Sequence, residues 1–576
     1  MSNVLMRSFS VSKGILSTRG GTSLFHTFRC LQSNPYMAIQ SRTYSCLAVD
    51  YEQFYNYTSG RFLINEEQQR ALRRTVFNVP ELKQLACEIV GAESCTSMEK
   101  VAEGAFAKIF LLTFDNSKSL IARIPSTRGG PPHFTTASEV ATMEYAREIL
   151  EIPVPKVLAW SSRASSTAVA AEFILMELVE GVTVDQRTET LEVPTEAKAL
   201  MEDVVDLHSK FLQAPLSQIG SIYYKEDVPE ALRDRPFYAD GYDGDERASQ
   251  RFRVGPMVTR EFWSADKASL DVDRGPWPDM QSYLIAIARS QQAWLRNCVV
   301  RRPEGDPFRR SDAEDSIEAH CAILDIFVKM VPYVTPHDYI LTSPIMWHPD
   351  LNPRNIMARE ALPYGISGIL DWQNTRVAPV ILQCEFPSSF TFRYNYIDYP
   401  LGSDIPSRPT DYNTLPLTQK KAVHQELLGG KLQKGIELSL NEKVPYQLTM
   451  ESPLRKVLVE LMDEVVDTWF IGFPVFRETL RNLDRRLRKS FPEYDLPPAV
   501  AEEDLEEHQK MLAALEAYIT AWVDLDEKLD MQGEGWVRAN EYEERKKRLD
   551  EARAEWDSSK GPFPFQDGVW SRDFGC

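Results

Sequence analysis

The order of two hydrophobic patterns most constrains how this chain can fold. Between residues 98 and 178, apolar residues occur in the short, partly alternating runs typical of β-strands; beyond residue 180 they recur at helical spacing. One helical pattern, Ser138–Leu150, interrupts the strands. A chain that has its strands in one part and its helices in the next usually packs the two kinds of element in separate regions of the fold. This order predicts an α+β fold with a small β-rich N-terminal lobe and a large helical C-terminal lobe.

Up to residue 330, five strands are expected, together with four helical regions besides Ser138–Leu150. The tetrapeptide Asp115-Asn116-Ser117-Lys118 has the residue types of a tight turn, so its flanking strands should form a hairpin. The expected strands are Met98–Glu103, Ala107–Phe114, Ser119–Ile124, Val157–Trp160 and Ala171–Leu178. Helices are expected within residues 62–92 and at Ala197–Leu212, Asp279–Asn297 and Asp312–Met330.

The 576 residues exceed one small domain and divide into four parts. Residues 1–44 are predicted to be a targeting segment, 45–180 the N-terminal lobe with its preceding helices, 181–415 the C-terminal lobe, and 416–576 a helical extension of that lobe. Residues 214–278 are loop-rich and contain Gly255-Pro256 and Gly275-Pro276-Trp277. We therefore expect a long insertion there rather than a separate domain.

The N-terminal segment differs in charge from the rest of the chain. Residues 1–49 contain many serines and no acidic residue, and the first acid is Asp50. An acid-free, Arg- and Ser-rich start is typical of a mitochondrial transit peptide. A secretory signal fits less well, because no continuous apolar stretch follows the first charges. Arg42-Thr43-Tyr44-Ser45 resembles a matrix-peptidase site with cleavage after Tyr44. We predict a location in the mitochondrial matrix; a basic tail without a targeting role is the alternative.

The remaining chain is acidic. The formal net charge is −19, from 65 basic and 84 acidic side chains, and the basic residues of the first segment make the body still more negative. Such a surface repels phosphate backbones, so we expect no nucleic-acid partner. A cationic acceptor substrate, such as an amino-alcohol or an amine, would suit this negative charge. The charge alone does not identify the acceptor.

Membrane spans and structural zinc are not expected either. The longest apolar stretch, Ala168–Val179, is interrupted by Glu172 and Glu177, so it is predicted to be a core strand. The eight cysteines form no CxxC pair, and no histidine lies at zinc-site spacing from them. We expect reduced, mostly buried thiols.

The segment from Trp347 to Met357 carries the most informative chemistry. It contains His348, then Asp350 two residues later, then Asn355 five residues after Asp350. The apolar pair Ile369-Leu370 leads into Asp371, sixteen residues after Asn355. Taken singly, Asp and Asn beside Pro usually form turns, and a lone His is usually a core residue. The combination after a strand-rich half is far more specific.

Phosphoryl transfer explains why such residues would occur together. One carboxylate must orient the attacking hydroxyl or accept its proton, and an amide with a second carboxylate must hold Mg²⁺. Asp350 is the predicted base, and Asn355 and Asp371 are the predicted metal ligands. His348 is predicted to support the catalytic loop by hydrogen bonding.

On these residues the chain resembles the aminoglycoside phosphotransferase and choline kinase-like family, a branch of the protein-kinase-like fold. Leu-Asp-Trp at 370–372 is similar to the family's Ile-Asp-Trp, and the likeness is greatest to fungal mitochondrial members. The resemblance covers about residues 60–400. Its supporting segments are Glu103–Phe106, Ile121–Pro125, Ser138–Thr142 and Ile152–Val157.

The resemblance implies ATP and Mg²⁺ as cofactors, and a nucleotide site in the N-terminal lobe. Gly104 would lie in the turn that approaches the phosphates, and the backbone of Glu177 and Leu178 would bind adenine. Arg123 occupies the position of the family's phosphate-binding Lys, with Glu139 on the next helix as its partner. Each of these assignments has a structural alternative. Arg123 and Glu139 could form an ordinary exposed ion pair, Gly104 could be needed only for the turn, and Glu177-Leu178 could simply be the end of a strand.

Two departures from the family pattern leave two functions open. Arg123 replaces a Lys, which is not a conservative change, and Ala105 and Ala107 stand where further glycines would be expected. The first prediction is an ATP- and Mg²⁺-dependent phosphotransferase acting on a small-molecule hydroxyl. The alternative is a weak or inactive kinase-fold protein that binds nucleotide or a partner.

A protein kinase fits the sequence poorly. Asn352 stands where Ser/Thr kinases carry Lys, and Asp371 is followed by Trp-Gln instead of Phe-Gly. No Ala-Pro-Glu motif follows. The oligomeric state is not predicted.

Overall fold

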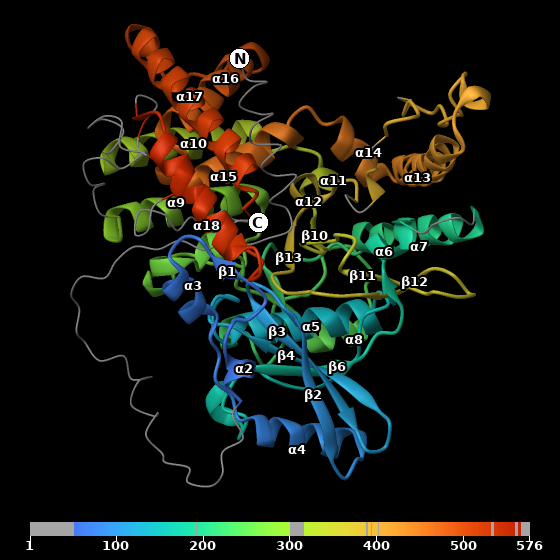
Figure 1. Cartoon of the computed structure of the whole chain (residues 1–576). Helices are drawn as coiled ribbons and strands as arrows, with labels where there is room; N and C mark the ends of the chain where they lie inside the picture. Colours follow the sequence, from blue (N-terminus) through green and yellow to red (C-terminus); the bar gives the residue numbers. More distant parts are fainter. Residues whose placement is uncertain are drawn as a thin grey trace.

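The chain forms a strand-rich lobe and a larger helical lobe, as predicted from its hydrophobic patterns (Figure 1). The computed structural model describes residues 51–189, 194–299, 316–387, 390–392, 394–400, 402–531, 535–558, 561 and 563–565. The predicted transit segment 1–44, with its cleavage position, lies outside the described residues, as does the predicted start of the helix at Asp312.

A five-stranded antiparallel sheet, in the order β2-β3-β4-β6-β5, is the core of the N-terminal lobe. All five predicted strands are present, and the turn at Asp115–Lys118 joins β3 to β4, with Thr113 opposite Ser119. The strand bounds are β2 (Cys95–Glu103), β3 (Ala107–Phe114), β4 (Ser119–Pro125), β5 (Val157–Ser161) and β6 (Phe173–Glu177).

The outer face of this sheet is covered by helices α2 (Glu52–Tyr55) and α4 (Val79–Val90). Helix α4 begins where the side chain of Asn78 accepts a hydrogen bond from Glu81 N (3.3 Å), and it ends at Gly91, whose φ of +67° suits a glycine. Alternate residues of β3 (Phe110, Leu112 and Phe114) join its apolar face in one core.

Helix α5 (Phe134–Glu148) lies against the same lobe and begins earlier than the predicted start at Ser138. Most of its residues are buried, including Thr135, Ser138 and Glu139. A helix with polar residues on a buried face does not show a simple amphipathic stripe. The hydrophobic pattern therefore located the helix but missed its first turn.

The segment predicted to be loop-rich, residues 214–278, contains a two-stranded sheet of β8 (Ser221–Tyr224) and β9 (Phe252–Gly255). Helix α8 (Glu246–Arg251) lies between the two strands in the chain and leads directly into β9. The two short strands are far apart in sequence and pack on α5 through a cluster around Ala137 and Tyr223. Because tertiary packing stabilises them, their local sequence gave little sign of them.

Small strand pairs organise the centre of the C-terminal lobe. Strand β10 (Pro344–Trp347) pairs with β13 (Arg376–Pro379). Strands β12 (Ile366–Ile369), β11 (Ile356–Ala358) and β7 (Val182–Thr183) form a second sheet in that order. These strands carry the segments on either side of the predicted catalytic residues.

Helices form the remainder of this lobe around two apolar cores. The predicted helices are present as α7 (Pro194–Gln213), α9 (Met280–Asn297) and α10 (Ile317–Val334). The shorter helices of this lobe are α6 (Val184–Glu189), α11 (Tyr339–Thr342) and α12 (Val380–Gln383), and its short 3₁₀ turns include η4 (Arg260–Phe262). Helix α3 (Glu66–Arg73) precedes the N-terminal sheet in the chain.

The C-terminal region is helical, and its end returns to the N-terminal part of the chain. It contains α13 (Leu417–Asn441), α14 (Val444–Glu451), α15 (Arg455–Ile471), α16 (Phe473–Ser490), α17 (Leu505–Leu529) and α18 (Tyr542–Glu555). Strand β14 (Trp536–Val537) pairs with β1 (Arg61–Phe62). Helix α18 accordingly lies beside β1 and α3 in Figure 1.

Across the described ranges, no helix is both long enough and apolar enough to cross a membrane. Cys87, Cys95, Cys298, Cys321 and Cys384 are free thiols.

Candidate functional site

The loop after β10 is organised by His348, which is buried. Its Nδ1 accepts a hydrogen bond from Asp350 N (3.1 Å), and its Nε2 lies 3.0 Å from Leu370 O. Burial lowers the pKa of His348 to about 4, although nearby Asp371 opposes this shift. The ring is therefore neutral at pH 7, with its proton on Nε2, where it donates to the carbonyl. His348 thus joins the Asp350 loop to the segment that carries Asp371.

Asp350 has one carboxylate oxygen held by amides. Its Oδ2 accepts hydrogen bonds from Asn352 Nδ2 (2.8 Å) and Asn355 Nδ2 (3.3 Å). Burial raises the pKa of Asp350, the bond from Asn352 lowers it, and Asp371 raises it further, with a net rise. Within the described residues Oδ1 has no hydrogen-bond partner, so this oxygen is suited to accept a proton from an incoming hydroxyl.

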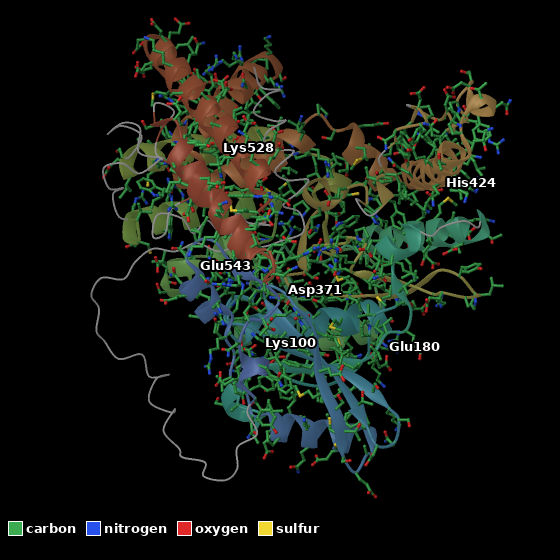
Figure 2. All side chains as sticks on the ribbon, viewed as in Figure 1. Lys100, Glu180, Asp371, His424, Lys528 and Glu543 are labelled. Atoms are coloured by element: carbon green, nitrogen blue, oxygen red, sulfur yellow. The ribbon has the colours of Figure 1, made fainter. Side chains whose placement is uncertain are left out.

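The β11–β12 hairpin brings Asn355 and Asp371 together. Ile356 pairs with Ile369, and Leu370 N donates to Asn355 O (2.7 Å). Asn355 Nδ2 also donates to Asp350 O (2.9 Å). These bonds fix the amide nitrogen toward Asp350 and leave the side-chain oxygen Oδ1 of Asn355 for another ligand. Asp371 has a φ of +60°, and its side chain is 48% exposed. The sixteen-residue separation in sequence is thus closed by one hairpin. Asp371 is labelled in Figure 2.

A buried charge cluster joins the N-terminal lobe to Asp371. Arg123 Nε lies 2.8 Å from Glu139 Oε1, and its Nη2 lies 3.3 Å from Asp371 Oδ1. Burial lowers the pKa of Arg123, but the charges of Glu139 and Asp371 outweigh it and raise the pKa, so the guanidinium is charged. The Arg123–Glu139 pair expected from the resemblance is therefore formed, and it is buried rather than exposed.

Gln373 was not identified from the sequence. It is buried, its Oε1 accepts a hydrogen bond from Arg123, and its Nε2 donates to Gly129 O. The only sequence signal was its position two residues after Asp371. A buried amide can bridge an arginine and a backbone carbonyl in this way because it carries both an acceptor and donors.

The three remaining predicted residues lie elsewhere in the N-terminal lobe. Gly104 is in the turn between β2 and β3, where its N donates to Ala107 O (3.0 Å). The Glu177 side chain accepts from Lys156 N (3.0 Å) and lies 3.4 Å from Arg147, and Leu178 is exposed. Within the described chain, no hydrogen bond or ion pair links these three to the Arg123 cluster.

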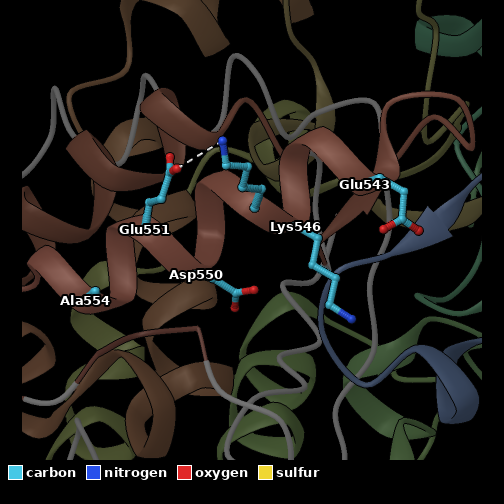
Figure 3. Close-up of a pocket in the computed structure, with 6 residues that line it drawn as sticks. Glu543, Lys546, Asp550, Glu551 and Ala554 are labelled. Atoms are coloured by element: carbon cyan, nitrogen blue, oxygen red, sulfur yellow. Dashed lines mark ion pairs between the residues drawn. The ribbon is translucent and has the colours of Figure 1, made fainter.

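Two hollows of the described surface lie away from the clustered residues. Figure 3 shows a hollow whose lining residues, which include Glu543, Lys546 and Glu551, all belong to α18. This hollow is therefore the outer face of one helix. A second cavity of about 520 Å³ lies where Ile152 and Pro153 meet α7 and β12. In neither hollow do Asp350, Asn355 or Asp371 line the wall.

Sequence comparisons relate this chain to known proteins. Residues 97–382 match the model of the phosphotransferase enzyme family. A subtelomeric hrmA-associated cluster protein of Aspergillus fumigatus is 30% identical over 359 residues, which are 57% of this chain and 67% of the relative. The mitochondrial altered inheritance of mitochondria protein 9 of Yarrowia lipolytica is 26% identical over 433 residues, 71% of this chain and 72% of that protein.

The solved GDP complex of aminoglycoside 2′-phosphotransferase-IIIa is 11% identical and covers 72% of this chain and 100% of that chain, with a TM-score of 0.32. This likeness in structure is weak, whereas the sequence matches are extensive. The chain belongs to the phosphotransferase enzyme family. The family resemblance and the two-lobed α+β fold predicted from the sequence are confirmed.

Proposed function

We propose that this protein transfers the γ-phosphoryl group of Mg·ATP to a hydroxyl of a small molecule. One observation carries the proposal: Asp350, Asn355 and Asp371 are linked by hydrogen bonds through one loop and one hairpin, and Arg123 reaches Asp371 from the other lobe. Phosphoryl transfer depends on positioning and charge stabilisation, and these residues are the types that supply both.

Asp350 is the proposed base. Its Oδ2 is oriented by two amides, and Oδ1 faces no protein donor within the described residues. Oδ1 would accept the proton of the acceptor hydroxyl while the oxygen of that hydroxyl bonds to phosphorus and the bond to the leaving ADP oxygen breaks. The raised pKa of Asp350 makes it a better proton acceptor than an exposed carboxylate.

Asp371 and Asn355 fit a magnesium ion. A half-exposed carboxylate and an amide oxygen are hard oxygen ligands, which Mg²⁺ prefers. When bound, the ion would neutralise charge on the transferring phosphoryl group. Arg123 lies 3.3 Å from an oxygen of the same Asp371 carboxylate, and its guanidinium would bind phosphate oxygens beside that carboxylate. The backbone of Glu177 and Leu178 would bind adenine, and Gly104 would lie against the phosphates.

The mitochondrion is the proposed location. Several relatives are described as mitochondrial, and the acid-free N-terminus of this chain has the composition of a matrix transit peptide.

Binding and transfer are tested separately. Saturating Mg·ATP should raise the melting temperature of the full chain, because a ligand that binds only the native state stabilises it. Asp371→Ala should abolish that rise, whereas the exposed control Asp404→Ala should retain it. An unchanged melting temperature of the wild-type protein with saturating Mg·ATP would refute nucleotide binding.

Asp350→Ala should preserve the rise in melting temperature and lower phosphoryl transfer, or the slower ATP hydrolysis, by about 10²–10⁴-fold. A phosphorylation screen of a metabolite pool by mass spectrometry would supply the acceptor. Equal activity of the wild-type protein and Asp350→Ala would contradict the role of Asp350.

A protein that binds nucleotide with little or no turnover is the second candidate, and Arg123 in place of Lys favours it. An arginine is bulkier than a lysine and is fixed in charge. In that case Mg·ATP should still raise the melting temperature, and Arg123→Lys should increase turnover.

A further inference from the structure

The turn between β2 and β3, Glu103–Ala107, has little structure of its own to hold it over a nucleotide. It contains one glycine, and its internal hydrogen bond runs from Gly104 N to Ala107 O (3.0 Å). A mobile loop must lose conformational freedom when phosphates bind, which costs affinity. This β2–β3 loop is, however, contacted at both ends by elements from distant parts of the chain.

The first contact is at Glu103, whose side chain is 2% exposed. Its Oε2 accepts hydrogen bonds from Thr58 N (2.7 Å) and Ser59 N (3.1 Å). Its Oε1 lies 3.1 Å from Lys100 Nζ, which in turn donates to Asn56 O (2.8 Å). Hydrogen bonds to a buried carboxylate are among the stronger ones in proteins, so Glu103 fixes the loop to residues 56–59.

Residues 56–59 lead directly into β1, which is attached to the C-terminal tail. Strand β1 pairs with β14, and Leu63 N donates to Gly535 O (2.8 Å). The Arg61 guanidinium lies 3.4 Å from the centre of the Tyr542 ring on α18. Helix α18 is seen against β1 in Figure 1, and Glu543 lies near this junction in Figure 2. The tail is therefore connected to the start of the β2–β3 loop through one strand.

The second contact is at Phe106, near the other end of the loop. The Arg260 guanidinium lies 5.2 Å from the centre of the Phe106 ring, a cation–π distance. Arg260 belongs to η4 in the segment 214–278, so this contact joins the two lobes. Phe106 O also accepts from Ser126 N (2.7 Å), which fixes the backbone beneath the ring.

We infer that Glu103 and Arg260 are positioning residues that hold the β2–β3 loop in its nucleotide-binding conformation before nucleotide arrives. Glu103 acts through residues 56–59 and the docked tail, and Arg260 acts through the ring of Phe106. This inference rests on the proposed function. It assigns the C-terminal tail and the insertion a common effect, which is to order a phosphate-facing loop that has a single glycine.

Two variants and two matched controls test the inference in the full chain. In Glu103→Gln the amide nitrogen must face either the Thr58 and Ser59 N–H groups or the Lys100 ammonium, so one set of contacts is lost. Arg260→Gln removes the cation above Phe106. The controls are Glu99→Gln, an exposed glutamate on the same strand, and Arg408→Gln, an exposed arginine 4.6 Å from the Tyr412 ring.

The first readout is hydrogen exchange of peptides covering residues 103–107, without nucleotide. Exchange should be about tenfold faster in Glu103→Gln and Arg260→Gln than in the wild-type protein and both controls. The second is the dissociation constant of Mg·ATP by calorimetry, which should rise about tenfold in each variant and more in the double variant, with kcat changed little. This split distinguishes loop positioning from general destabilisation.

Each outcome decides between the alternatives. Unchanged exchange in both variants would overturn the inference, as would faster exchange with unchanged Mg·ATP affinity. A wild-type protein that fails to bind Mg·ATP would refute the proposed function instead, and the exchange measurement would still show whether these residues order the loop.

Discussion

His208 and His348 are both buried, and burial lowers the pKa of each imidazole to about 4. Their surroundings differ. His348 bonds to Asp350 N and Leu370 O, whereas neither ring nitrogen of His208 has a hydrogen-bond partner within the described residues. His208 packs edge-on against Trp347, 5.0 Å between ring centres. One histidine organises the site, and the other fills space beside it.

This contrast predicts opposite effects of the same substitution at pH 7. His208→Phe should leave the free energy of unfolding unchanged or raise it, because an unpaired polar ring is replaced by an apolar one. His348→Phe should lower it by more than about 2 kcal/mol, because two hydrogen-bonding groups lose their partner. Urea unfolding measures both. An equal loss in the two variants would show that His208 has a polar role.

Acid should act through the same residues. A histidine whose native pKa is about 4 and whose unfolded pKa is near the usual 6.5 binds its proton first in the unfolded state, so stability falls as pH falls from about 6.5 to 4. Between pH 7 and pH 5, His208→Phe should lose about 2 kcal/mol less stability than the wild-type protein. Parallel losses in both proteins would contradict the buried, neutral state of His208.

At the scale of elements, the β8–β9 sheet supports α5 and hence the Arg123–Glu139 pair. Tyr223 on β8 is fully buried in one cluster with Ala137 of α5, and its hydroxyl donates to Pro256 O (2.7 Å). The edge of the Phe134 ring, at the start of α5, also meets Tyr223. The insertion, residues 214–278, thus packs against helix α5, which carries Glu139 and holds it beside Arg123.

Removing the Tyr223 ring should therefore affect both stability and the site. Tyr223→Ala should cost about 3–5 kcal/mol by leaving a cavity, and the loosened α5 should raise the dissociation constant of Mg·ATP about tenfold. Tyr223→Phe retains the ring and should cost only about 1 kcal/mol, with unchanged nucleotide affinity. Chemical unfolding and calorimetry measure the two effects. Unchanged nucleotide binding in a folded Tyr223→Ala protein would show that α5 does not depend on this sheet.

At the scale of the whole molecule, β1 and β14, the first and last strands of the described chain, pair with each other. Gly60 precedes this pair, and a Cβ atom there would lie 2.2 Å from Trp536 Nε1. Only a residue without a side chain allows the indole to pack at this position. The close approach makes Gly60 a point where tail docking can be weakened by one methyl group.

Gly60→Ala should displace Trp536 and cost about 1–3 kcal/mol. Cleavage by trypsin at Arg538, beside β14, should become faster than in the wild-type protein. Gly104→Ala is the matched control for stability, because a Cβ atom there meets nothing within 4 Å. Equal cleavage rates for wild-type protein and Gly60→Ala would show that the tail does not depend on this contact.

The sequence by itself determined the elements whose signals are local. Alternation predicted the five sheet strands, turn residues predicted the β3–β4 hairpin, and helical spacing predicted α7 and α9. The spacing of His348, Asp350, Asn355 and Asp371 was the basis of the resemblance to the family, and phosphoryl transfer uses carboxylates and an amide of this kind. The roles proposed for them remain predictions for the mutants described above.

Only the tertiary structure decided which distant groups meet. The bond from Arg123 to Gln373, the packing of β8 on α5, and the attachment of Thr58 and Ser59 to Glu103 each join segments far apart in sequence. No local pattern encodes such contacts, because two short strands or two polar side chains gain stability only when the folded chain brings them together. For the same reason, the docking of the C-terminal tail could not be read from its helical pattern, although its helices could.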